Sequence, residues 1–175
     1  ACLAGDISQA LMDRNYEKAK NIALQYRDIF GEGNFYLEIQ DHGLPEQKEV
    51  NAALVKLSKE INIPLVATND IHYVNKEDSK IHDVLMCIQM GKTVNDPNRM
   101  RFGSDEFYLK SREEMEELFP YAPEAIDNTV KIAEMCNIEF DFNTIHLPKY
   151  DVPEGYTPDT YLRELCFKGL EERYD

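Results

Sequence analysis

The sequence lacks the features that mark membrane and disulfide-rich secreted proteins. Its apolar runs all fall short of the roughly 20 residues that a membrane-spanning helix needs. No secretory signal peptide is visible, and the chain begins with alanine. The cysteines form neither a C-x-x-C pair nor a dense framework, which predicts reduced thiols. We therefore expect a cytoplasmic protein with no membrane segment. The four cysteines are Cys2, Cys87, Cys136 and Cys166.

Basic residues are scarce. The chain has 19 Lys and Arg against 33 Asp and Glu, which gives a formal net charge of -14. Averaged over the surface, this charge repels nucleic acid. Lys92, Arg99 and Arg101 come closest to a local basic patch. We interpret them as part of a solvated loop, with contact to phosphates as the alternative.

The first half of the chain alternates between strand and helix patterns. A β-branched and aromatic run at residues 35–40 and a short apolar run at residues 65–68 predict two buried strands. Residues 45–62 between them carry apolar side chains at helical spacing. Residues 1–5 read as a strand end and tight loop. Asp6 or Ser8 is expected to cap a short helix to about residue 12, and a second helix is expected over residues 15–30. Such alternation predicts an α/β fold with parallel strands and crossover helices.

After Tyr73 the alternation stops and helical patterns follow. Helices are expected over residues 77–90, 111–119, 123–136 and 157–174, with a proline-containing linker at residues 138–156. The predicted domain boundary lies near residue 140. Residues 1–140 would form the α/β part with a helical extension, and residues 141–175 a linker and a further helix.

The candidate site follows the second predicted strand. Asp70 and His72 are two residues apart, so their side chains share one face of an extended backbone. A carboxylate and an imidazole at a strand end can hold a divalent metal such as zinc or manganese. In the alternative interpretation, Asp70 caps a loop and His72 is an ordinary half-buried histidine.

Three other residues fall at predicted strand ends, where sites form in parallel α/β folds. Cys2 differs from the other cysteines, because it precedes a glycine-containing turn at the presumed end of a strand. Asp41 and His42 are candidate pocket-lining residues. For these two, a plain loop turn, in which Asp41 accepts hydrogen bonds from local amides, is the favoured alternative.

Six motifs occur in a fixed order along the chain. Together they resemble the alpha subunits of bacterial DNA polymerase III, the C-family replicative polymerases. The resemblance runs from the later part of the N-terminal polymerase and histidinol phosphatase (PHP) domain into the start of the polymerase core. It implies an incomplete PHP-type β/α barrel followed by a helical extension, within an internal segment of a longer protein. The motifs are Cys2-Leu-Ala-Gly5, Tyr36-Leu-Glu-Ile-Gln-Asp-His-Gly43, Val66-Ala-Thr-Asn-Asp-Ile-His-Tyr73, His82-Asp-Val-Leu-Met-Cys-Ile88, Glu106-Phe-Tyr-Leu-Lys110 and His146-Leu-Pro148.

The resemblance also implies a chemistry. Asp70 and His72 match the last metal motif of PHP domains, Asp-x-His, and Cys2 matches an earlier ligand position. An active PHP centre hydrolyses phosphodiesters with zinc or manganese, here as a 3′–5′ proofreading exonuclease. The other PHP ligands and the magnesium-binding catalytic residues of the DNA-directed DNA polymerase, a nucleotidyltransferase, would lie outside these 175 residues. This segment would therefore contain no catalytic residue and have neither activity alone.

The implied partners of the longer protein are DNA and replisome subunits such as the sliding clamp and the proofreading exonuclease. The truncated barrel is expected to self-associate, because its uncovered sheet edge and helix faces are apolar. Two other functions stay open. One is a stand-alone PHP phosphoesterase that acts on a small phosphate monoester. The other is a metal-free structural module that binds replisome partners.

Overall fold

A computed structural model describes residues 3–174, which divide into two compact units. The first unit ends at Asn137 and the second begins at Ile138. Cys2, the third predicted metal ligand, lies outside the described residues. Leu3 to Gly5 form a turn, so the strand expected before them also lies outside the described part.

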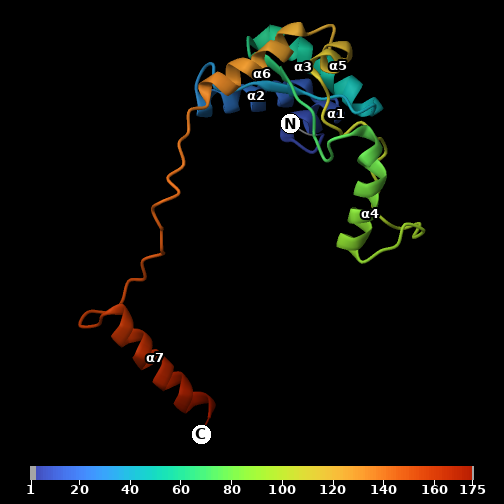
Figure 1. Ribbon diagram of the computed structural model, residues 1–175. Helices are drawn as coiled ribbons and strands as arrows, with labels where there is room; N and C mark the ends of the chain where they lie inside the picture. Colours follow the sequence, from blue (N-terminus) through green and yellow to red (C-terminus); the bar gives the residue numbers. More distant parts are fainter. Residues whose placement is uncertain (1–2, 175) are drawn as a thin grey trace. The chain divides into compact units, whose positions relative to one another are not determined.

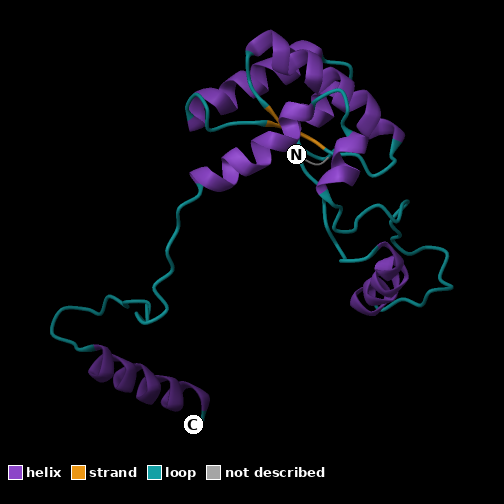
Figure 2. Cartoon of the chain, turned by 45° about the horizontal axis from the view of Figure 1, so that its top comes forward, coloured by secondary structure: helices purple, strands orange, loops and turns teal. Residues whose placement is uncertain are grey.

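The first unit is a small parallel sheet packed among helices (Figures 1 and 2). Its elements are α1 (Asp6–Met12), α2 (Tyr16–Phe30), β1 (Leu37–Ile39), α3 (Pro45–Ile61), β2 (Leu65–Ala67), the 3-10 turn η1 (Lys76–Asp78), α4 (Ser79–Met90), α5 (Arg112–Leu118) and α6 (Pro123–Met135).

The sheet confirms the predicted strand–helix–strand unit. β1 and β2 are parallel, with Leu37 opposite Leu65 and Ile39 opposite Ala67, and α3 crosses between them. Each strand is shorter than predicted. In the loop after β1, the Gln40 carbonyl accepts a hydrogen bond from the Asn51 side chain on α3 at 2.9 Å. The Gln40 carbonyl is therefore satisfied by a side chain rather than by a neighbouring strand.

The core lies against one face of the sheet, the face that carries Leu37, Ile39, Leu65 and Ala67. Buried side chains of α3, such as Leu57, and of α6, such as Ile126, pack there in the same cluster. Phe119, which is 0% exposed, belongs to the same cluster. The Asn128 side chain on α6 donates to the Leu65 carbonyl at 2.7 Å, so helix and strand are joined by a buried hydrogen bond as well as by apolar contact.

The helix ends follow local capping chemistry, with one correction. Asn15 caps α2 by accepting from the Lys18 amide, and Ser111 forms a capping box at α5. The expectation that Asp6 or Ser8 caps α1 is wrong, because Gly5 occupies that position without a side-chain hydrogen bond. The Asp6 carboxylate instead accepts a hydrogen bond from the Tyr26 hydroxyl on α2 at 2.8 Å, which joins the two helices.

The long loop after α4 is fastened to that helix by a two-pronged ion pair. Arg99 Nη1 and Nη2 lie 2.5 and 2.6 Å from Asp83 Oδ1 and Oδ2, and the Arg99 side chain is 3% exposed. The Arg99 hydrogen bond lowers the pKa of Asp83, because the guanidinium favours the charged carboxylate. The interpretation of the basic trio as a solvated loop is therefore wrong for Arg99. Lys92 pairs with Asp96 at 3.3 Å.

The second unit contains one helix, α7 (Pro158–Arg173), after the stretch 138–156 that forms neither helix nor strand. Thr157 caps α7, and Pro158 occupies its first turn. The assignment of this unit to the start of a polymerase core stays a prediction. Across residues 3–174, no helix is long and apolar enough to cross a membrane.

Candidate functional site

The loops that follow β1 and β2 meet at one edge of the sheet, because the two strands are parallel. Gln40 Nε2 donates to the Thr68 hydroxyl at 3.1 Å, and the Asp70 amide points at His42 Nε2 at 3.3 Å. The structure therefore brings the two predicted strand ends into direct contact.

His42 is buried beneath the loops at this edge of the sheet. Its side chain is fully covered, and its ring stacks on Phe107 with centroids 4.2 Å apart and planes at 9°. The His42 amide donates to Gln47 Oε1 at 2.8 Å, while Gln47 Nε2 lies 2.9 Å from His42 Nδ1. Burial lowers the pKa of His42, which favours the neutral ring. His42 thus packs beneath the loop that carries Asp70. Its role as a pocket-lining residue stays a prediction.

Asp41 forms a loop turn and also lines a cavity, the two alternatives considered for it from the sequence. Its carboxylate accepts a hydrogen bond from the Gly43 amide at 2.8 Å, as in an Asx turn. It also lines a cavity of about 520 Å³ together with Asn51 and Tyr121. Gly43 has a φ of 80°, in the left-handed region where glycine is favoured, so the turn after β1 depends on this residue.

Asp70 and His72 lie side by side after β2. Asp70 Oδ1 is 3.9 Å from His72 Nδ1, and the same ring nitrogen lies 2.9 Å from the Asp70 carbonyl oxygen. A carbonyl oxygen only accepts, so Nδ1 is the donor of this hydrogen bond, and Nε2 is the ring nitrogen that it leaves unused. Metal-binding histidines commonly donate their second ring nitrogen to a backbone carbonyl in this way.

The donors at this edge fit a divalent metal in kind but do not complete a ligand shell. A carboxylate and a neutral imidazole suit zinc or manganese. Within residues 3–174, no group of three or more His, Cys, Asp and Glu side chains is placed to hold a metal ion. Asp70 and His72 therefore supply two ligands at most from the described part of the chain.

Sequence reasoning missed the aromatic cluster that holds His72 in place. The His72 ring meets Phe102, His82 and Phe107 edge-on, with centroids 4.8, 5.3 and 5.5 Å away. The His72 amide donates to the Phe107 carbonyl at 2.8 Å, and a single parallel bridge joins Tyr73 to Tyr108. The run Phe107 to Lys110 belongs to one of the ordered motifs, and its aromatic content was the one sequence signal for this cluster.

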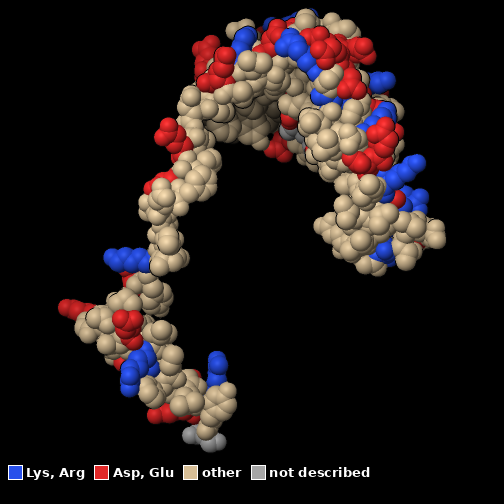
Figure 3. All heavy atoms as spheres, viewed as in Figure 1, with Lys and Arg blue, Asp and Glu red and all other residues tan. Residues whose placement is uncertain are grey.

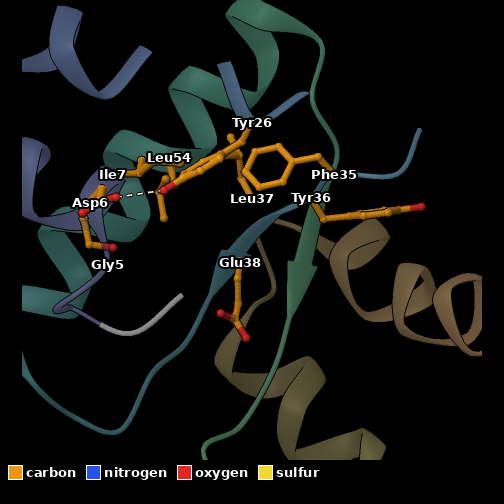
Figure 4. A pocket seen from close by; sticks show the side chains of 10 residues that line it. Gly5, Asp6, Ile7, Tyr26, Phe35, Tyr36, Leu37, Glu38 and Leu54 are labelled. Carbon is orange, nitrogen blue, oxygen red and sulfur yellow. Dashed lines mark hydrogen bonds between the residues drawn. The ribbon is translucent and has the colours of Figure 1, made fainter. Parts of the chain in front are cut away.

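A separate pocket of about 410 Å³ opens beside β1, between α1, α2 and α3. Tyr26 and Phe35 lie along it, and the Tyr26 hydroxyl bonds Asp6 across it (Figure 4). None of the predicted site residues that the structure describes lines this pocket.

The sequence was compared with models of known protein families and with known proteins. The family model of the PHP domain matches residues 1–42, a stretch that ends at the buried histidine.

The chain is also similar over 99% of its length to proteins named DNA polymerase III subunit alpha. Identity is 44% to that of Treponema pallidum, 45% to that of Borreliella burgdorferi and 44% to that of Thermus aquaticus. The chain spans 15% of the length of each of these relatives. The resemblance inferred from the ordered motifs is thus confirmed: the chain is homologous to a segment of bacterial DNA polymerase III alpha subunits.

Proposed function

We propose that this chain is a segment of a replicative DNA polymerase III alpha subunit, and that its first unit is part of a PHP domain that hydrolyses phosphodiester bonds at the 3′ end of DNA. The observation that carries the proposal is the pairing of Asp70 and His72 at the strand edge. His72 Nδ1 is fixed on a carbonyl at 2.9 Å, which leaves Nε2 free to bind a metal.

The fold proposal goes one step beyond the small sheet. A parallel strand–helix–strand unit such as β1–α3–β2 is the repeating element of β/α barrels. We propose that further strands of the longer protein continue this sheet into a barrel. Barrel enzymes build their sites from loops at the carboxyl ends of the strands, which is where Asp41, Asp70 and His72 lie.

The residues of this chain would have separate roles at the proposed centre. The Asp70 carboxylate and His72 Nε2 would hold a zinc or manganese ion, together with ligands from elsewhere in the longer protein. When bound, the metal polarises the phosphate and lowers the pKa of a water molecule. The Asp70 carbonyl orients the His72 ring, and Phe102 and Phe107 restrict its rotation through edge contacts.

The rest of the proposal concerns the longer protein. We place DNA synthesis, and the magnesium site that it needs, outside this segment. DNA, the sliding clamp and the proofreading exonuclease are the proposed partners, in the cytoplasm of a bacterium. Figure 3 shows Lys and Arg interspersed with Asp and Glu on the visible face of the first unit. The net charge of -14 nevertheless makes DNA contact over the whole surface unfavourable. The proposal therefore confines DNA contact to a small site.

The test is 3′-end hydrolysis by the full-length protein. A 5′-labelled single-stranded oligonucleotide, incubated without nucleotides, is expected to shorten from its 3′ end when zinc or manganese is present. A zinc-selective chelator added in excess magnesium should stop this shortening while DNA synthesis continues, because the two sites use different metals. If no combination of these metals gives shortening, the proposed hydrolysis is wrong, and the structural-module function is favoured instead.

A further inference from the structure

A third cavity, of about 460 Å³, lies beside the candidate metal ligands. It is formed by the start of α4 and by residues 99–105 of the loop that returns from it. His82 lines the cavity, and its ring centroid is 5.3 Å from that of His72. The cavity is therefore adjacent to the proposed metal centre, and its size is that of a small-molecule site.

The charge of this cavity differs from that of the chain as a whole. Its lining includes three cations, Lys80, Arg99 and Arg101, and two carboxylates, Asp83 and Asp105. Arg99 is bound to Asp83, and the Asp105 carboxylate lies 3.6 Å from Lys76 Nζ, outside the cavity lining. Both carboxylates of the lining are therefore already paired with other cations, Arg99 and Lys76. Lys80 and Arg101 remain as excess positive charge at the cavity, in a chain with a net charge of -14.

Lys80 and Arg101 are the two rim cations. Both are exposed, and neither forms an ion pair with any residue that the structure describes. Arg101 Nη2 donates to the Val94 carbonyl at 3.1 Å, which holds the side chain in place without neutralising it. An ordered guanidinium and a nearby ammonium are suited to a phosphate group.

The wall of the cavity is aromatic. The rings of Tyr73 and His82 lie 5.5 Å apart at 48°, and those of His82 and Phe102 lie 5.2 Å apart at 74°. Met86, which is buried, lines the cavity with them. Aromatic faces are used to contact nucleobases without sequence preference, and they would add little to the binding of a bare inorganic anion.

We infer that this cavity is a nucleotide subsite, in which Lys80 and Arg101 bind a phosphate and the Tyr73–His82–Phe102 wall contacts the base or sugar. The inference rests on the proposed function, because the cavity lies next to the centre that would cleave the 3′-terminal bond. It names the substrate as a deoxynucleotide of a DNA strand, and it excludes a small monoester without a base.

The test measures binding in the absence of metal, so that it does not depend on hydrolysis. Full-length protein in EDTA is titrated calorimetrically with 2′-deoxyadenosine 5′-monophosphate, with deoxyadenosine and with inorganic phosphate. We expect the monophosphate to bind more tightly than either of the others. Lys80→Glu should weaken its binding about tenfold or more, because a charged hydrogen-bonding partner of the phosphate is replaced by a repelling carboxylate.

One further variant is a control for charge, and another tests the second rim cation. Lys18→Glu makes the same charge change at an exposed position on α2, and it should leave the affinity unchanged. Arg101→Gln keeps a side-chain amide that can donate to the Val94 carbonyl, and it should weaken binding like Lys80→Glu.

The outcomes separate this inference from the proposed function. Affinity that is unchanged by both Lys80→Glu and Arg101→Gln would overturn the subsite, as would equal binding of deoxyadenosine or of inorganic phosphate. Binding that needs Lys80 and Arg101 supports it, even if the same protein fails to shorten DNA. In that case the proposal of hydrolysis is wrong, and the nucleotide subsite is still supported.

Discussion

In the full-length protein, Asp70→Ala is expected to reduce 3′-end hydrolysis about 100-fold or more and to leave DNA synthesis unchanged. Substitution of residues that merely support metal ligands typically costs about 10- to 100-fold in activity or affinity, and Asp70 is proposed to be a ligand itself. His72→Ala should have the same effect, because its Nε2 is the second proposed donor. The rate of shortening of a 5′-labelled oligonucleotide measures both variants.

Matched controls test whether the effect is local. Asp13→Ala removes an exposed carboxylate after α1, and His146→Ala removes an exposed imidazole in the second unit. Both should retain full hydrolysis. If Asp70→Ala and His72→Ala hydrolyse DNA as fast as these controls do, the two side chains are not ligands of the catalytic metal.

Phe119→Ala is expected to lower the free energy of unfolding of the first unit by about 3–5 kcal/mol. Phe119 is 0% exposed and belongs to the cluster around β1 and β2, so its removal leaves a cavity that the surrounding side chains only partly fill. Native-state hydrogen exchange of β2 and α6 amides in the full-length protein would report the loss.

The control for this substitution is Phe142→Ala. Phe142 is 88% exposed in the second unit, and its removal should change the same exchange by less than about 0.5 kcal/mol. An equal effect of the two substitutions would show that Phe119 does not pack in the core as described.

The sequence predicted those parts of the fold that depend on local chemistry. The long helices α2, α3 and α6 begin and end within a few residues of their predicted limits. Apolar spacing, Gly31 after α2 and the prolines at the starts of α3 and α6 act over one or two turns. The parallel pairing of β1 and β2 follows from the helix between them. The ends of the strands were harder to predict, since each strand is one or more residues shorter than its apolar run.

The surroundings of the site could not be predicted, because distant segments build them. His42 is stacked on Phe107, 65 positions further along the chain, and no local pattern indicates that contact. Arg99 reads as a loop cation until its ion pair with Asp83 is seen.

The spacing of Asp70 and His72 did indicate that they lie close together. The hydrogen bond that selects the His72 ring nitrogen depends on how the backbone turns after β2. That turn is a product of the tertiary structure, so the donor nitrogen of the proposed metal ligand could not be named from spacing alone.

The measurement that tests the account most directly is the zinc and manganese content of the full-length protein by mass spectrometry. Three proteins are compared: the wild type, the double variant Asp70→Ala/His72→Ala, and the control Asp13→Ala/His146→Ala. We predict that the wild type and the control retain bound zinc or manganese after dialysis and that the double variant loses it. Equal metal content in all three proteins would contradict the assignment of Asp70 and His72 as metal ligands.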